Sequence, residues 1–272
     1  MRHKWKYLKT LLLLPFAVAV AYPFIFIVAT SLKAQTEISA HPYGLLFTPT
    51  LENYISVFER FSILRSLFNN IEITSISVAG VVIFAAMAAY PIIYNPNKFN
   101  KFMGGIMIMG YLIPGQALLI PLYQIMIKTQ LINKVYGVIF LYLAGSSLAV
   151  YLYMGYMKTI PKDMFEAATI DGCGVWATFW KVIFPLMTPI VATVVIFNVF
   201  GVWNDFLNPY LFLSSPKNAT LILQVQKTRD QFAVEWGLGL AITSIIMIPL
   251  FFFYVFTQKY LIKGMTSGAI KG

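Results

Sequence analysis

Six long stretches of the sequence contain no Asp, Glu, Lys or Arg, and this pattern restricts the chain to folds that a lipid bilayer accepts. The stretches cover 10–32, 73–97, 102–127, 135–157, 182–204 and 236–258. Each has 23 to 26 residues, so as a helix rising about 1.5 Å per residue it spans a hydrocarbon core of about 30 Å. Backbone groups in a bilayer must be paired within the segment, which favours helices. One such stretch can be a core helix of a soluble protein, whereas six in succession predict an all-α membrane protein with six transmembrane helices.

The composition agrees with this fold class and excludes several kinds of site. Hydrophobic residues make up 59% of the chain and charged residues 11%, and the mean hydropathy is +0.74. The single cysteine, Cys173, excludes an internal disulfide and a thiolate metal cage. The two histidines, His3 and His41, form no cluster with ligand spacing. We therefore predict no metal site and no catalytic residue.

The first charge-free stretch resembles a secretory signal. Four basic residues precede it, and Ala19-Val20-Ala21 has the form of a cleavage site. However, the apolar run continues to Val28 and five further stretches follow. We therefore expect the segment to be retained as a transmembrane helix.

Basic residues are divided unevenly between alternate connections. With the N-terminus inside, the cytoplasmic segments hold 12 of the 20 Lys and Arg residues and the outward segments hold 8. The outward segments are then 34–68, with Lys33 at its edge, the loop near Asn133 and 206–235. Because basic residues are concentrated in cytoplasmic loops of membrane proteins, we predict that both termini are cytoplasmic. The net charge of +10 therefore reflects topology and does not indicate nucleic-acid binding.

Polar side chains inside the spans are uncharged, and some of them form a candidate path for an uncharged, hydroxyl-rich substrate. The candidate path residues are Gln116, Tyr123, Asn198, Trp203 and Asn204. Hydrogen bonding between neighbouring helices is the alternative role for each of them. The third span also contains Pro114-Gly115 and Pro121, which interrupt a helix only where neighbours or water satisfy the freed carbonyls. This favours a position in the interior of the bundle.

The sequence contains no group that would supply energy for transport along such a path. An ion-coupled secondary carrier of a neutral solute is the alternative function, but such carriers use ionisable residues at mid-membrane or two repeated halves, and we find neither. An intramembrane enzyme lacks a His/Asp/Glu constellation in the spans. The chain also lacks a G-x-x-x-x-G-K-[ST] loop for binding nucleotide phosphates. Any ATP must therefore be handled by another polypeptide, which requires a docking surface.

The 158–185 loop, predicted to be cytoplasmic, is the candidate docking surface. Pro161 suits a first helical turn, and Gly172 and Gly174 can end a helix with positive φ, so we predict a short helix over 162–170. Within it, Ala167 and Ala168 leave a surface small enough for close approach by a partner. Glu166 and Asp171 are available for polar contacts.

Apolar residues follow this short helix at helical spacing. They are Val175, Trp176, Phe179, Trp180 and Ile183, and Pro185 ends or bends the stripe that they form. We predict that the stripe lies against the base of the bundle. An ordinary interfacial helix pair anchored by tryptophan is the alternative.

Several of these residues carry a resemblance to a known family. The segments Glu166-Ala167-Ala168, Asp171-Gly172 and Val182-Ile183-Phe184-Pro185 resemble the EAA loop of membrane subunits of binding-protein-dependent ABC importers. Trp203-Asn204-Asp205-Phe206 and the tail from Gln258 to Gly272 are similar to the carbohydrate branch, in particular to the smaller permease subunit of maltose-type importers. Val182, Phe184 and Cys173-Gly174 depart from the usual family residues.

The resemblance implies that 1–272 form a single ABC importer transmembrane domain in the cytoplasmic membrane of a prokaryote. It implies a second, homologous permease subunit, two ATP-binding subunits and an extracellular sugar-binding protein as partners, with membrane lipid around the chain. This chain would bind no cofactor, since ATP and Mg belong to the ATPase subunits. Coupling to them is implied for Glu166, Ala167, Ala168, Asp171, Gly172 and Pro185, and a tail contact for Gly268, Ala269 and Lys271. The sugar is not identified by these features.

Overall fold

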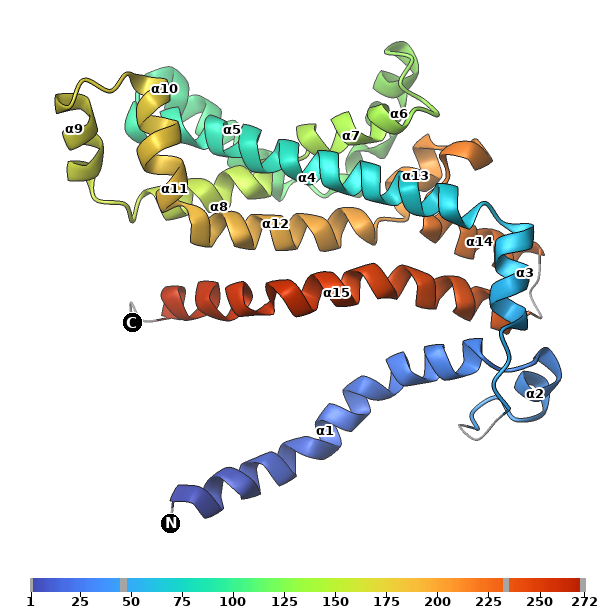
Figure 1. The fold of residues 1–272 in the computed structure, drawn as a ribbon. Coiled ribbons are helices and arrows are strands. Elements are labelled where there is room, and N and C mark those ends of the chain that lie inside the picture. The colour runs from blue at the N-terminus through green and yellow to red at the C-terminus, as the bar shows by residue number, and fades with distance from the viewer. Residues whose placement is uncertain (1, 45–47, 232–234, 270–272) are drawn as a thin grey trace. The chain divides into compact units, whose positions relative to one another are not determined.

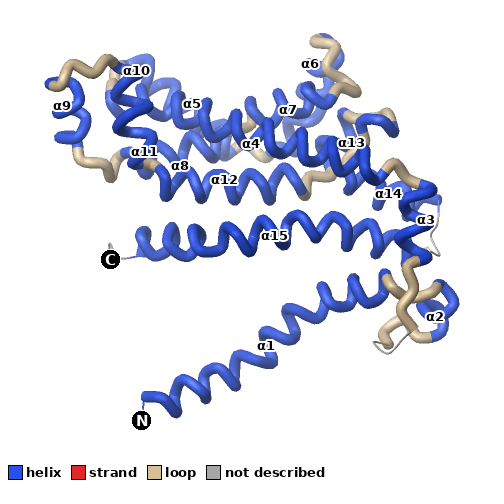
Figure 2. Tube along the Cα trace, in the orientation of Figure 1, coloured by secondary structure: helices blue, strands red, loops and turns tan. Residues whose placement is uncertain are grey.

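The structure is a computed structural model that describes residues 2–44, 48–231 and 235–269, with side chains over 12–44, 48–228 and 235–260. All regular elements in these described residues are helices (Figures 1 and 2). The chain forms two compact units. The first comprises Met1–Ser66 and Leu221–Leu250, and the second comprises Leu67–Thr220 and Phe251–Gly272.

The first unit is built around four helices and the beginning of a fifth. They are α1 (Arg2–Ser31), α2 (Gln35–Ala40), α3 (Glu52–Arg60), α14 (Leu221–Gln231) and the first part of α15 (Trp236–Ala269), together with the first turn of α4 (Ile63–Tyr94). The hydroxyl of Tyr54 on α3 lies 2.7 Å from Ser31 Oγ and 2.8 Å from Ser244 Oγ on α15. A side chain at Gly237 is excluded, since a Cβ there would lie 2.5 Å from Asn53 Oδ1. The glycine therefore permits the close approach of α15 to α3.

The second unit contains the remaining helices. After α4 come α5 (Lys98–Leu112), η1 (Gly115–Leu118), α6 (Leu119–Lys128), α7 (Val135–Ala144), α8 (Ser147–Met157), α9 (Lys162–Ile170), α10 (Val175–Thr178), η2 (Phe179–Ile183), α11 (Phe184–Leu186), α12 (Thr188–Trp203), α13 (Leu207–Phe212) and η3 (Pro216–Asn218). Helix α8 packs against both α5 and α12. The last part of α15 contacts α12 through Phe253 and Phe200, whose ring centroids are 6.0 Å apart. In Figure 1, α9 and α10 lie at one end of this unit, and α6 and α13 lie at the other end.

Four helices within the described residues are long and apolar enough to cross a membrane. They are Leu12–Ser31, Ile63–Tyr94, Val135–Met157 and Trp236–Tyr260. The number reaches six if two bent helix pairs each count as one span. The multi-pass, all-helical architecture therefore agrees with the prediction, whereas the third and fifth spans are not single straight helices.

The third span is broken at the predicted Pro114-Gly115 position. Helix α5 ends at Leu112, and the segment from Gly115 to Lys128 continues at an angle of 100°. Pro121 does not break the chain again, because it lies in the first turn of α6, where a backbone N–H has no partner within the helix. Pro114 thus lies at the break in the span, whereas Pro121 is accommodated because it lies near the start of a helix.

The fifth span, predicted as a continuous helix over 182–204, bends by 77° at Met187. Neither Pro185 nor Pro189 has an N–H to donate to the preceding turn, so two carbonyls lose their usual partners. The hydroxyl of Thr188 donates to one of them, the carbonyl oxygen of Pro185, at 2.6 Å. The helical segment that carries the apolar stripe was predicted to end or bend at Pro185. It continues instead through the π-helical turn η2 and through α11 to the bend at Met187.

Several helices extend beyond the charge-free stretches that predicted them, and α4 and α15 extend furthest. Helix α4 begins at Ile63, ten residues before the predicted span, because Arg65 and Glu72 are tolerated where they are not buried. Helix α15 continues to Ala269, so the predicted tail from 259 starts within a helix. Gly268 and Ala269 belong to this helix, and Lys271 lies outside the described residues.

Candidate functional site

Helix α9 (Lys162–Ile170) forms the outer part of the 158–185 loop, where the sequence predicted a helix over 162–170. Pro161 is its N-cap residue, and Asp163 lies in the first turn, where a carboxylate is stabilised by the helix dipole. A helix of nine residues has little stability in isolation, so its position depends on how its ends and its inner face are held.

Gly172 ends α9 in a Schellman motif. The backbone N–H of Cys173 donates to the carbonyl oxygen of Ala168 at 2.9 Å, and that of Gly172 donates to Thr169 at 3.0 Å. Gly172 has φ of +78°, which glycine adopts without a steric penalty. Gly174, which was also predicted to have positive φ, has φ of −68° and precedes α10 in extended conformation. One glycine therefore ends the helix, not two.

Charged, small and apolar side chains are exposed on α9 and at its C-terminal end. Glu166, Ala167 and Asp171 are exposed, and Ile170 is 85% exposed. Ala168 is only 5% exposed, because successive helical residues are about 100° apart and this one faces the chain's own bundle. Of the two predicted alanines, Ala167 alone is accessible in this chain.

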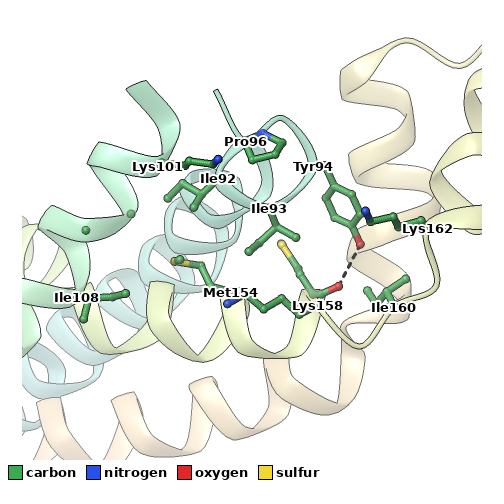
Figure 3. Close-up of a pocket in the computed structure, with 13 residues that line it drawn as sticks. Ile92, Ile93, Tyr94, Pro96, Lys101, Ile108, Met154, Lys158, Ile160 and Lys162 are labelled. Atoms are coloured by element: carbon green, nitrogen blue, oxygen red, sulfur yellow. Dashed lines mark hydrogen bonds between the residues drawn. The ribbon is translucent and has the colours of Figure 1, made fainter. Parts of the chain in front are cut away.

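Phe165 attaches α9 to the bundle. Its ring stacks on Tyr94, with centroids 5.1 Å apart and planes at 15°, and lies 6.3 Å from the ring of Tyr90. Both tyrosines belong to the last turns of α4. The hydroxyl of Tyr94 donates to the carbonyl oxygen of Met157, the last residue of α8, at 3.4 Å (Figure 3). Phe165 therefore joins α9 to the end of α4, and Tyr94 joins that end of α4 to the end of α8.

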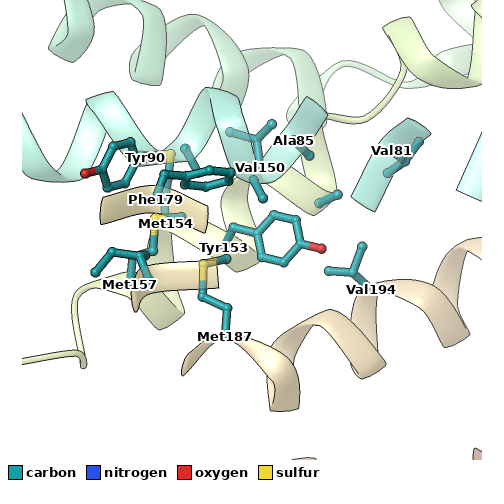
Figure 4. Packing of buried hydrophobic residues seen from close by; sticks show 14 of the residues in the cluster. Val81, Ala85, Tyr90, Val150, Tyr153, Met154, Met157, Phe179, Met187 and Val194 are labelled. Carbon is teal, nitrogen blue, oxygen red and sulfur yellow. The ribbon is translucent and has the colours of Figure 1, made fainter. Parts of the chain in front are cut away.

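The predicted apolar stripe is buried along one side only. Phe179 and Ile183 are 1% and 0% exposed, and Phe179 packs against Tyr90 with ring centroids 5.2 Å apart (Figure 4). In contrast, Val175 and Trp176 are 67% and 63% exposed. Trp180, also exposed, contacts Phe179 edge-on. One side of the stripe thus continues the core, and no described residue covers its other side.

Loops at the opposite end of α4 are held together by asparagine side chains. The Nδ2 group of Asn69 donates to the carbonyl oxygens of Lys217 and Ala219, at 3.0 Å each. The backbone N–H of Asn133 donates to Phe212 at 2.7 Å, and Asn133 Oδ1 accepts from the N–H of Ser215 at 2.9 Å. The loop near Asn133 and the segment 212–219 are therefore neighbours.

The two ends of α4 thus contact different loops. Asn69 contacts the segment around Lys217, and Tyr94 contacts the 158–185 loop. The 25 residues that separate Asn69 from Tyr94 correspond to about 37 Å of helix. This distance is sufficient to cross a hydrocarbon core.

Asp205 is the acidic residue at the end of the fifth span. Its Oδ2 atom accepts hydrogen bonds from the hydroxyl of Tyr142 at 2.8 Å and from the amide of Asn208 at 2.6 Å. Its Oδ1 atom accepts from the backbone N–H of Asn208 at 3.3 Å, which fixes the start of α13. The carboxylate therefore links α7 to the connection between α12 and α13.

Two candidate path residues lie on the bent third span. Gln116 is exposed on η1, and Tyr123 is exposed on α6. The ring of Tyr123 stacks on Phe212 of α13 with centroids 6.0 Å apart. This contact brings α6 to the same region as the end of the fifth span.

The other three candidate path residues lie on the last two turns of the fifth span. The amides of Asn198 and Asn204 donate to backbone oxygens of their own helix, those of Val194 at 2.8 Å and Phe200 at 2.9 Å. Asn204 is exposed and Asn198 is half-buried, whereas Trp203 is 5% exposed. Trp203 is thus part of the interior of this chain. Among the described residues, no donor is hydrogen-bonded to the amide oxygens of the two asparagines.

Sequence reasoning did not identify Phe165 or Tyr94 as contact residues. The sequence does contain an indication for Phe165, since Phe165 and Ala168 are three residues apart and therefore share one helix face. The partner of that face, at the end of α4, has no signature in the sequence. Within the described residues, no three His, Cys, Asp or Glu side chains are grouped to hold a metal ion.

Comparison with known proteins identifies relatives along nearly the whole chain. The family model described as "Binding-protein-dependent transport system inner membrane component" matches residues 81–267. The chain is 32% identical over 270 residues to the probable starch degradation products transport system permease protein AmyC of Thermoanaerobacterium thermosulfurigenes, covering 99% of this chain and 98% of that protein. It is 34% identical over 274 residues to the melibiose/raffinose/stachyose import permease protein MelC of Bacillus subtilis, covering 98% of each chain.

A solved structure shares the fold. One chain in the crystal structure of a bacterial ABC transporter involved in the import of the acidic polysaccharide alginate superposes with a TM-score of 0.81 at 23% sequence identity. The match covers 95% of this chain and 96% of that chain.

Proposed function

Because the chain belongs to the family of binding-protein-dependent transport system inner membrane components, we propose that it forms one membrane-spanning half of an ATP-driven importer for sugars or oligosaccharides. Permeases of this family are not enzymes, and the ATPase activity of such importers resides in separate subunits. The proposed partners are a second homologous permease, two ATP-binding subunits and an extracellular sugar-binding protein. The proposed location is the cytoplasmic membrane of a prokaryote.

The attachment of α9 to the bundle is the observation that supports coupling to an ATPase. A coupling element must present a surface to the ATPase and must also transmit its movement to the transmembrane helices. Glu166 and Ala167 provide the exposed surface, and Phe165 provides the contact with the end of α4. In the proposed cycle, ATP binding moves α9 and shifts the bundle from an inward-open to an outward-open state, and hydrolysis reverses the shift.

The proposed substrate path uses neutral side chains. Gln116, Tyr123, Asn198 and Asn204 would contact sugar hydroxyls, and Trp203 would pack behind the asparagines, in line with its burial. The matching surface of the second permease would complete the path. Uptake of a panel of radiolabelled sugars by proteoliposomes containing the complete complex tests the function, and a complex that imports none of them in an ATP-dependent manner would refute it.

We expect the two ends of α4 to face opposite sides of the membrane. In a Cys173→Ser background, a membrane-impermeant maleimide applied to intact cells should label Ser214→Cys and leave Thr169→Cys unlabelled. Both positions are exposed in the structure, so a lack of labelling reports sidedness and not burial. As the control, Thr169→Cys is labelled in inverted vesicles that lack the ATPase subunits. Labelling of Thr169→Cys and not of Ser214→Cys in intact cells would contradict the proposed orientation.

We expect the segment around η3 to contact the docked binding protein. Lys217 is exposed, while its backbone is held by Asn69, so the Lys217→Glu substitution changes the charge of this surface without unfolding it. The half-saturating concentration of sugar-loaded binding protein in ATPase assays should increase about three- to tenfold, as for a contact at the rim of an interface. The matched control is Lys128→Glu, another exposed lysine outside this segment. An equal effect of both substitutions would indicate general charge repulsion only.

We also propose a regulatory contact between the ATPase subunits and the C-terminal residues, including Gly268, Ala269 and Lys271. Deletion of 265–272 should then change the ATPase rate or its dependence on sugar while the complex remains assembled. Unaltered kinetics would exclude this role.

A further inference from the structure

A pocket of about 560 Å³ lies next to the start of α9, between the end of α4, α5 and the end of α8. Its volume is in the range of ligand sites in proteins. No residue in the proposed substrate path lines it. The pocket lies entirely within the second unit, at the same end of α4 as the 158–185 loop.

Three lysines from three different segments line this pocket. Lys101 is on α5, Lys158 follows α8, and Lys162 is the first residue of α9. In Figure 3, Lys101 lies beside Ile92, Lys162 beside Tyr94, and Lys158 near Met154. The lining contains no Asp or Glu. Among the described side chains, no carboxylate lies within ion-pair distance of these ammonium groups, so their charges remain available for an anion.

The rest of the lining is mostly apolar and is shaped by two glycines of α5. At Gly104 a Cβ would lie 2.9 Å from Ile92 Cγ2 and 3.4 Å from Met154 Cε, so this glycine lets α5 approach α4 and α8 closely. At Gly105 a Cβ would meet nothing within 4 Å. This combination gives an apolar recess with a basic rim.

We propose that the pocket binds an anionic phospholipid of the cytoplasmic leaflet. The lysines would contact the phosphate headgroup, and the recess along Gly105, Ile108 and Ile93 would hold part of an acyl chain. Basic pockets between transmembrane helices on the cytoplasmic side are suited to anionic headgroups. The inference rests on the orientation in the proposed function, which places this end of α4 at the cytoplasmic face. Since Lys162 begins α9, a bound headgroup would connect that helix to α5.

Lipid retention by the complete, purified complex tests the site. The complex is equilibrated in nanodiscs of phosphatidylcholine with a minor fraction of phosphatidylglycerol, extracted, and measured by native mass spectrometry without ATP or sugar. The wild type should retain phosphatidylglycerol, and the triple variant Lys101→Gln/Lys158→Gln/Lys162→Gln should retain on the order of a hundredfold less, since each of the three lysines at a membrane surface contributes roughly fivefold. The matched control is Lys98→Gln/Lys181→Gln/Lys259→Gln, which removes three exposed lysines outside the pocket.

A second variant tests the recess without changing charge. Gly105→Leu fills space that none of the described side chains occupies around its Cβ, and it introduces a better helix former, so the protein should fold while lipid retention decreases. Equal retention by the wild type and both pocket variants would refute the lipid site. Displacement of the lipid by inorganic phosphate at equal concentration would also overturn it, because the site would then bind a free anion. A complex that imports sugar normally but retains no anionic lipid would refute this inference and leave the proposed function unaffected.

Discussion

Replacing Gly172 by valine is expected to abolish the stimulation of ATP hydrolysis by the sugar-loaded binding protein, while the chain still inserts into the membrane. Gly172 has φ of +78°, a conformation that costs an L-residue about 1–2 kcal/mol and a β-branched residue more. The substitution therefore disfavours the turn that ends α9 and the two hydrogen bonds made there. A shift of about 1.4 kcal/mol between the coupled and uncoupled positions of α9 is a tenfold change in population.

The matched control for this substitution is two residues away. Gly174 has φ of −68°, and a Cβ there meets nothing within 4 Å, so Gly174→Val should be tolerated. Stimulated and basal ATPase rates of both variants are compared in reconstituted complexes of equal subunit composition. If Gly172→Val retains wild-type stimulation, the shape of the turn after α9 is irrelevant to coupling.

Replacing Phe165 by alanine is expected to uncouple ATP hydrolysis from transport. The substitution removes the ring that stacks on Tyr94, and the loss of a half-buried aromatic contact costs about 1–3 kcal/mol, less than for a fully buried phenylalanine. Because the exposed side chains of Glu166 and Ala167 are unchanged, α9 should still bind the ATPase subunits. We expect ATP hydrolysis to continue while the number of sugar molecules imported per ATP falls about tenfold, in keeping with that energy.

Two further variants show whether the ring itself is responsible. Phe165→Tyr keeps the aromatic contact and should restore most of the transport. Met164→Ala removes an apolar side chain from the neighbouring position, which is 43% exposed, and should have little effect. An equal loss in the alanine variants at 164 and 165 would mean that α9 depends on general hydrophobicity and not on the contact with α4.

Much of the fold can be predicted from the sequence because the bilayer leaves few alternatives. Lengths between charges located the candidate spans, four of them as long helices and two as bent helix pairs. Pro161 and Gly172 located α9 within a residue of its bounds, because a helix start and a left-handed helix end each require particular residues. The same reasoning missed the extension of α4 to Ile63. Charges such as Arg65 are excluded only from the hydrocarbon core. The length of a charge-free stretch therefore indicates the part of a helix that lies inside this core, and not the full length of the helix.

The bend at Met187 and the inner contacts of α9 are not determined by local pattern. Pro185 predicted a bend, but the position and angle of the bend also depend on Pro189 and on the hydrogen bond of Thr188. That hydrogen bond is seen only in the folded structure. In the same way, the burial of Ala168 depends on which face of α9 meets α4. The roles of the path residues and of the tail remain predictions.

Contact between α9 and the ATPase subunit is tested most directly by a photo-crosslinker at Ile170. This side chain is 85% exposed on α9, so benzoylphenylalanine in its place should not disturb the bundle. Irradiation of the complex in membranes should attach this chain to the subunit that carries the G-x-x-x-x-G-K-[ST] nucleotide loop, identified by mass spectrometry. The same crosslinker at Lys217 should not capture that subunit. Capture of the ATPase at Ile170 alone is the result that we predict, whereas capture only from Lys217, or from neither position in an assembled complex, would contradict the account.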